Sequence, residues 1–307
     1  MNPPSSTAFV SVVIPAHNRA HFVLEAVRSA LSQGPAVGEV VVVDDGSTDA
    51  TPEVLRTISD PRLSVLRQAQ SGPVAARNHG WLASHGDWVL FLDSDDALPS
   101  GAVELLLAAA RKHPERIAFG EASVHAQQLD QPPHYTFCFA HRDGNLLNEL
   151  CFYAGGTILS CLFPRSVLRE TGGFGGLPES DDCEDFDFGL RLALRYEFTF
   201  VPFVCYQIRM HDTNRHRPLH RQVWASSLVC VERRLPSNSR YWLLKRRVKA
   251  YYRGLMAGYD LTQHQSASAI RGFILSLLWW PIKLGAWRGL FQACTQCVLR
   301  APPPARN

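Results

Sequence analysis

The sequence predicts an α/β fold in which helices flank an open, mostly parallel sheet, with a helical extension at the C-terminal end. Apolar β-rich runs alternate with segments that carry apolar residues at helical spacing, and two of the runs end in clusters of acids. The 307 residues, 46% hydrophobic and 19% charged, can bury a large core. We expect one sheet domain over residues 1–215 and a basic, aromatic extension over 216–307.

The first elements alternate regularly. Phe9 to Ile14 is an apolar β-rich run stopped by Pro15, and the segment 19–33 has helical periodicity. The valines at 40–43 are too continuous for a half-exposed strand, so they predict a parallel strand covered on both faces. The following elements are a strand at 62–66, a helix at 74–84, a buried strand at 88–92 and a helix at 99–112.

The pattern loosens after residue 113. The polar stretch 125–144 is interpreted as a variable loop or insert. Beyond it we expect a strand at 157–163, helices at 164–170 and 185–195, one or two strands over 198–210, and basic helices from residue 216.

Both acidic clusters follow buried strands. Asp44 and Asp45 end the first, and Asp93, Asp95 and Asp96 end the second. Parallel sheets bind ligands beyond the carboxyl ends of their strands. A single aspartate there is usually a turn or cap residue, but crowded carboxylates raise one another's pKa or recruit a cation. Without nearby His or Cys ligands, that cation would be Mg²⁺ or Mn²⁺, which bridges to substrate phosphates.

Other phosphate-binding classes fit poorly. The chain has no GxxxxGK[ST] run, which excludes a P-loop hydrolase. The glycine-rich segment 172–176 does not follow a strand and open a helix, so a dinucleotide-binding site is not expected. A net charge of +3 is too small to indicate a nucleic-acid partner.

Four ordered motifs, at 12–19, 41–49, 76–78 and 91–96, resemble those of family 2 glycosyltransferases with the GT-A (Rossmann-like) fold. The resemblance covers residues 9–212. It implies an inverting transfer of a sugar from a nucleoside-diphosphate sugar, with a uridine-type donor the first choice. The acceptor would be a saccharide or lipid-linked hydroxyl, in the synthesis of cell-surface polysaccharide or glycolipid.

The resemblance also implies roles for residues. Asp45 would bind the base and Asp93-Ser94-Asp95 would be the DxD metal motif. The residues implied around the donor are Pro15, His17, Asn18, Asp44, Asp45, Arg77, Asp93 and Asp95, and those implied at the Mg²⁺ or Mn²⁺ are Asp95, Asp96 and His211.

The catalytic base would lie further along the chain. Gly172-Gly173-Phe174 and the acids that follow resemble the family's GGF and ED elements, which implies Asp185 as base. Glu184 is the second candidate and Asp187 a competitor, although acids here also suit a helix N-terminus. Arg209-Met210-His211 resembles the terminal Arg-x-His motif, whose histidine approaches the metal or diphosphate.

Two other functions stay open. Asp93-Ser94-Asp95 superficially matches haloacid-dehalogenase-like phosphatases, in which the first Asp is a nucleophile. That family carries its motif on the first strand, followed by Thr or Val where Ala97 stands here. The other alternative is a catalytically silent nucleotide-binding scaffold, which the intact acids disfavour.

The extension is apolar and aromatic at 270–287, but Pro281 and Lys283 interrupt it before the roughly 20 residues a spanning helix needs. Flanking basic residues suit peripheral membrane contact through 270–290; a helical cover or homo-oligomer contact is the alternative. Met1 to Ala8 lacks the basic and apolar regions of a secretory signal. We therefore expect a cytoplasmic location, with contact at the inner face of the plasma membrane as an option.

Overall fold

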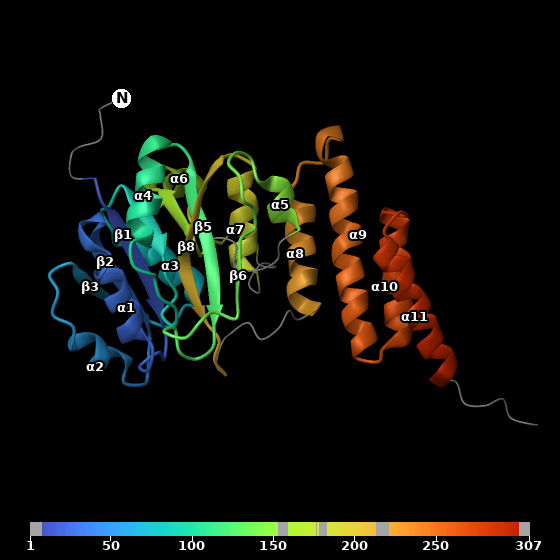
Figure 1. The fold of residues 1–307 in the computed structure, drawn as a ribbon, viewed down its shortest axis with the longest axis horizontal. Helices are drawn as coiled ribbons and strands as arrows, with labels where there is room; N and C mark the ends of the chain where they lie inside the picture. The colour runs from blue at the N-terminus through green and yellow to red at the C-terminus, as the bar shows by residue number, and fades with distance from the viewer. Residues whose placement is uncertain (1–7, 153–158, 176, 178–182, 213–220, 301–307) are drawn as a thin grey trace, which may run out of the picture.

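A computed structural model describes residues 8–152, 159–175, 177, 183–212 and 221–300. One sheet runs through the first two thirds of the chain, in the order β3-β2-β1-β4-β7-β5-β6, with β8 paired to β5 (Figure 1). The strands are β1 Val10–Ala16, β2 Val37–Asp45, β3 Leu63–Gln68, β4 Trp88–Phe91, β5 Ile117–His125, β6 Tyr135–Phe137, β7 Cys161–Pro164 and β8 Phe198–Arg209.

The sheet is mixed but mostly parallel, as predicted. Strands β1 to β4 pair in parallel, as do β5 and β8, whereas β7 runs antiparallel to both β4 and β5. The register places Asp44 beside Ala16 and Asp45 beside Gln68. The carboxyl ends of β1, β2 and β4 therefore open onto one edge, where both acidic clusters lie.

Helices cover both faces of the sheet. Alternate valines of β1 and β2 enter two separate cores, because successive side chains of a strand point to opposite faces. α1 and α4 close one core, and α3, α6 and α7 close the other. The helices are α1 Val23–Leu31, α2 Thr51–Arg56, α3 Pro73–Ala83, α4 Ala102–Lys112, α5 Leu147–Cys151, α6 Arg165–Thr171, α7 Glu184–Ala193, α8 Arg221–Arg234, α9 Ser239–Thr262, α10 Ser266–Trp279 and α11 Leu284–Arg300, with a 3-10 turn at Gly34–Ala36.

The extension consists of helices wherever it is described, as expected. In Figure 1, α8 stands beside the sheet domain, α9 beside α8, and the α10–α11 pair lies outermost. α8 and α9 contribute Trp224, Val231 and Tyr252 to the core that holds α7. The domain boundary at residue 215 stays a prediction. A chain cut there to test it would lose the side chains that α8 and α9 contribute to this core. Among the described residues, every helix is too short or too polar to span a bilayer.

Three element predictions need correction. β5 was not predicted, and the stretch 125–144, expected as a loop, contains β6. The helix predicted over 19–33 begins only at Val23, because Asn18 has a left-handed φ of 52° and residues 19–22 form a turn. The strand predicted over 157–163 begins at Cys161, and residues 157–158 lie outside the described part.

Candidate active site

The loops after β1 and β2 are joined by Asn18. Its side-chain oxygen accepts hydrogen bonds from the backbone N–H groups of Thr48 and Asp49, at 2.8 and 3.3 Å, and its backbone N–H donates to the Ser47 hydroxyl. Asparagine tolerates the left-handed conformation better than most residues do. Nδ1 of His17 lies 2.8 Å from the carbonyl oxygen of Asp45. Hydrogen bonds between the motif residues thus hold the two loops together at the carboxyl ends of β1 and β2.

The two aspartates that end β2 are buried and held by the backbone. Asp45 accepts the N–H groups of Ser71 and Gly72 at 2.8 Å each, and the side-chain amide of Gln68 at 2.7 Å. Asp44 accepts the N–H of Ser47. Both carboxylates fix the loops after β2 and β3. Any contact of Asp45 with a nucleotide base would be made alongside these bonds.

Arg77 connects the two acidic parts of the site. Nη2 donates to Oδ1 of Asp93 over 2.7 Å, and Nη1 lies 3.6 Å from both Glu184 and Asp185. Its side chain is buried, and burial lowers the pKa of a guanidinium, but the charges of Asp93, Asp185 and Glu184 outweigh burial and raise the pKa of Arg77. The resemblance implies a place for Arg77 near the donor, and no pattern in the sequence indicates its contact with the α7 acids.

The segment 93–96 is held in place by the hydroxyl of Tyr206, which lies on β8. The backbone N–H of Asp93 donates to the Tyr206 hydroxyl at 2.9 Å, and that hydroxyl also bonds the Asp96 carboxylate. Asp96 is buried and accepts the N–H of Arg209. Burial, with the charges of Asp95 and Asp93, raises the pKa of Asp96 well above its usual value. Asp96 therefore faces inward in this structure, whereas Asp93 and Asp95 reach the edge.

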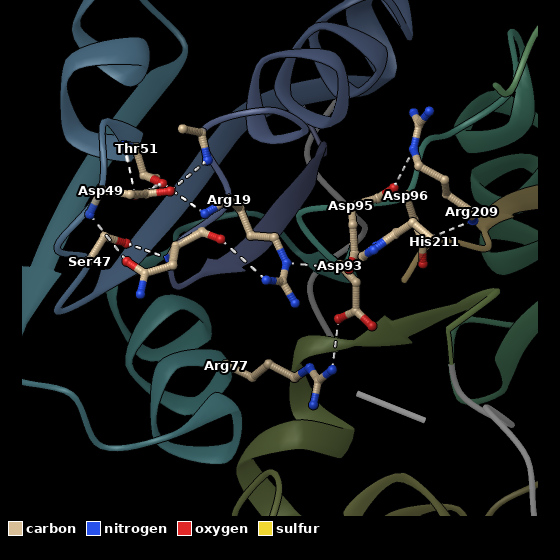
Figure 2. Close-up of polar contacts among 12 residues, drawn as sticks. Arg19, Ser47, Asp49, Thr51, Arg77, Asp93, Asp95, Asp96, Arg209 and His211 are labelled. Atoms are coloured by element: carbon tan, nitrogen blue, oxygen red, sulfur yellow. Dashed lines mark hydrogen bonds and ion pairs between the residues drawn. The ribbon is translucent and has the colours of Figure 1, made fainter. Parts of the chain in front are cut away.

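Asp95 lies between two cationic or ionisable side chains. Oδ2 is 3.3 Å from Nε of Arg19 and 3.0 Å from Nε2 of His211 (Figure 2). The His211 ring stacks on Phe22, with ring centroids 4.5 Å apart. Arg209 donates to the backbone oxygen of Asp95 at 2.9 Å. The predicted metal residues Asp95 and His211 are thus brought together from segments 116 residues apart.

Sequence reasoning missed Arg19 and Tyr206. Arg19 belongs to the first motif, but its spacing alone gave no reason to expect an ion pair with Asp95. Tyr206 is one of several aromatic residues in an apolar strand, and only the parallel pairing of β8 with β5 brings it beneath Asp93. A tyrosine three residues before an Arg-x-His motif was the available signal.

The acids that open α7 differ in accessibility. The Asp185 side chain is 20% exposed, against 6% for Glu184 and 1% for Asp187. Asp187 accepts two hydrogen bonds from Arg234, at 2.7 and 2.8 Å, which tie α7 to α8. All three benefit from the positive end of the helix. Asp185 is the acid of this group that an acceptor could reach.

The donor set suits a hard divalent cation that also binds phosphate. In the described part of the chain, no three His, Cys, Asp or Glu side chains converge as an all-protein metal site. Mg²⁺ needs only one or two protein carboxylates when substrate phosphates and water complete its coordination. Asp95, with His211 beside it and Asp93 nearby, fits such a site.

The chain belongs to glycosyl transferase family 2, whose sequence profile matches residues 11–170, just over half of the chain. The predicted class, a family 2 glycosyltransferase, is therefore confirmed, and it replaces the phosphatase alternative built on Asp93. The profile ends before α7, so it does not include Asp185 or His211.

Relatives agree with this class. The succinoglycan biosynthesis protein ExoO of Rhizobium meliloti is 38% identical over 127 residues, which is 40% of this chain and 36% of ExoO. The chondroitin synthase of Escherichia coli is 29% identical over 215 residues, 67% of this chain and 29% of that protein. The chain thus spans about a third or less of these two curated relatives.

The GT-A fold is confirmed by solved structures. The crystal structure of S. aureus TarS residues 1–349 in complex with UDP-GlcNAc superposes with a TM-score of 0.64. The match covers 97% of this chain and 93% of that one, at 17% sequence identity. The likeness includes the helical extension in its coverage and establishes the fold.

Proposed function

We infer that the chain transfers a sugar, with inversion, from a nucleoside-diphosphate sugar to an acceptor hydroxyl. A uridine-diphosphate sugar is the donor to test first, since a TarS structure is a complex with UDP-GlcNAc. ExoO and chondroitin synthase carry names from polysaccharide synthesis. They support a saccharide or lipid-linked acceptor in cell-surface polysaccharide or glycolipid synthesis.

One observation carries the proposal: Arg77 holds the strand-end acid Asp93 and the α7 acid Asp185 around a single guanidinium. This contact supports a diphosphate site beside Asp93 and a base at Asp185 that lie next to one another, although 92 residues separate the two acids in sequence. Direct displacement needs a base that faces the sugar from the side opposite the leaving group. Asp185 is the most accessible of the three acids that open α7, and it contacts the same guanidinium as Asp93.

In the proposed reaction, the acceptor oxygen attacks the anomeric carbon while the bond from that carbon to the diphosphate oxygen breaks. Asp185 accepts the hydroxyl proton, and the nucleoside diphosphate leaves with the bonding electron pair. Asp95 and His211, with Asp93, would hold Mg²⁺ or Mn²⁺, which when bound stabilises charge on the departing diphosphate. His17, Asn18 and Asp45 would shape the nucleotide side of the pocket.

The test pairs nucleotide binding with turnover. The protein is incubated with nucleoside-diphosphate sugars and Mn²⁺, and release of nucleoside diphosphate and thermal shifts are measured with and without chelator. Asp185→Asn should abolish turnover and leave the donor-induced shift intact. Glu184→Gln is the matched variant, expected to retain more activity. Loss of donor binding in Asp185→Asn would remove Asp185 from the role of base, and donor binding without any turnover would indicate a scaffold.

A further inference from the structure

The helical extension has an unusual charge. Residues 239–300 contain ten lysines and arginines against one acid, Asp260, a net charge of +9 in a chain whose total is +3. Asp260 is buried and pairs with Arg221 and Ser268, so it does not offset the surface charge. The extension is therefore strongly cationic, while the rest of the chain is net acidic.

The same helices expose large apolar side chains. Of the fourteen large hydrophobic residues exposed in the described part of the chain, eight lie between residues 242 and 291. We call these eight, with Arg271 and Arg288, the extension surface; the apolar members are Trp242, Leu243, Ile274, Leu278, Ile282, Leu284, Trp287 and Phe291. Three of them, Ile282, Leu284 and Phe291, are at least 74% exposed. Side chains this exposed bury little of their apolar surface within the fold, so they add little to its stability.

The spacing aligns these residues. On α10, Arg271, Ile274 and Leu278 recur at intervals of three and four, so they share one side of the helix. On α11, the same intervals align Leu284, Trp287 or Arg288, and Phe291, while Ala286 and Ala293 face inward. Each helix thus presents an apolar stripe with an arginine in or beside it.

The two stripes meet at the α10–α11 turn. The indole N–H of Trp287 donates to the Pro281 carbonyl at 2.8 Å, which folds the ring over the turn. Arg246 of α9 donates to the Trp279 carbonyl at 3.2 Å and lies over the Trp242 ring, 4.8 Å from its centroid. Tryptophans and arginines concentrated beside exposed aliphatic residues are typical of protein segments at a membrane–water interface.

We propose that the extension surface docks on an anionic lipid bilayer, with the α10–α11 turn and the exposed side of α11 in the headgroup region. The apolar stripes would leave water, and Arg271 and Arg288 would meet lipid phosphates. The predicted contact through residues 270–290 is thereby widened to Trp242 on α9. The proposal does not depend on the reaction proposed above.

Charge favours a bilayer over a second copy of the chain. A two-fold contact would bring the same face of two copies together, and each face belongs to the segment 239–300, whose net charge is +9. Without acids on that face among the described residues, the copies would repel one another. An anionic surface supplies the opposite charge.

The experiment measures sedimentation of the full chain with vesicles of phosphatidylcholine alone or mixed with phosphatidylglycerol. The wild type should bind the anionic vesicles and not the neutral ones. The variant Ile282→Ser, Leu284→Ser, Phe291→Ser should bind at least about tenfold more weakly. The matched control is Leu82→Ser, Leu105→Ser, which changes exposed leucines of the sheet domain and should leave binding unchanged.

Charge and depth are tested separately. Arg271→Gln, Arg288→Gln should also weaken binding about tenfold, and brominated lipids should quench tryptophan fluorescence of the wild type. Binding by the serine variant equal to that of the wild type would overturn the proposal. So would equal binding to neutral vesicles, or a wild-type dimer that the serine variant loses while vesicle binding is absent. Because no turnover is measured, failure here is distinct from failure of the proposed reaction.

Discussion

Asp93 accepts a 2.7 Å hydrogen bond from Arg77, and the same guanidinium faces Asp185 at 3.6 Å. Arg77 therefore contacts both the diphosphate side of the proposed site, through Asp93, and the acceptor side, through Asp185. A buried arginine shared by three acids neutralises charge that would otherwise separate these segments. Its removal should affect folding and chemistry together.

We expect Arg77→Met to lower the free energy of unfolding by about 3–5 kcal/mol, because buried acids lose their counter-charge. Turnover should fall below detection. Denaturant unfolding and nucleoside-diphosphate release measure the two effects. Arg56→Met, at an arginine that is 68% exposed and pairs with the exposed Glu53, is the control and should be nearly neutral for stability. An Arg77→Met protein as stable as the wild type would contradict the role of this residue.

His211→Ala should weaken Mn²⁺-dependent nucleotide binding by about 10–100-fold, since a ligand or close partner of the ion is lost. Nucleotide binding without metal should change much less. Titration calorimetry with and without Mn²⁺ separates the two. His113→Ala, at the end of α4, changes a half-exposed histidine that pairs with Glu115 and serves as control. Equal metal dependence in both variants would remove His211 from the metal site.

Tyr206→Phe removes only a hydroxyl, the group that receives the Asp93 N–H. The free energy of unfolding should fall by about 1–3 kcal/mol, because a buried polar group loses its partner. Donor affinity should also drop as the 93–96 segment loosens. Tyr259→Phe on α9 removes the hydroxyl of a half-buried tyrosine outside the site and is the control for donor binding. If the two variants behave alike in donor binding, Tyr206 has no positioning role.

Arg234→Leu should destabilise the chain by about 3–5 kcal/mol, because Asp187 is buried and would lose both of its hydrogen bonds from Arg234. The combined variant Asp187→Leu, Arg234→Leu should recover much of this loss. Turnover should stay reduced if the pair positions Asp185. A double-mutant cycle on unfolding measures the coupling, and Arg56→Leu at the exposed pair with Glu53 is the comparison. Additive single effects would disprove the coupling.

Lys283 predicts a pH dependence of stability. Its ammonium donates to the carbonyls of Ala250 and Tyr251, and burial lowers its pKa to about 8 from 10.5. Between these values the unfolded chain binds more protons than the folded chain does, so the free energy of unfolding rises with pH. We expect a gain of at most about 3 kcal/mol across this window. Lys283→Met should flatten the profile relative to the wild type, whereas Lys112→Met at an exposed site should not.

The alternation of strands and helices in the N-terminal part of the sheet was predictable from the sequence. Continuous apolar runs and strand-end acids indicated β1, β2 and β4 and their parallel direction, but not their order in the sheet. β5 was missed because Gly120 and Glu121 interrupt its apolar pattern. Gly120 is required where β8 crosses closely, since a Cβ there would lie 2.4 Å from Sγ of Cys205. This requirement for glycine arises from the close approach of two strands that are far apart in sequence, so no local sequence pattern reveals it.

The site was predictable to the same degree. The motifs identified the residues that gather at the sheet edge, and the structure brings Asp95 to His211 and Arg77 to Asp185. The orientation of each side chain was not predictable. Asp45 and Asp96 turn to backbone N–H groups, and this depends on the loops that fold over them. The assigned roles of these residues stay predictions.

The bond between Asp187 and Arg234 bears on how small a working enzyme can be made. Asp185 takes its position from α7, and α7 is fastened by an arginine that lies 64 residues beyond the family profile. A fragment cut at residue 215 would keep the strand-end carboxylates and α7 but lose that fastening, and one cut at residue 170 would lose α7 itself. A fragment that keeps α7 fastened must therefore extend through α8, which carries Arg234, and through α9 if Tyr252 is to stay in the core that holds α7.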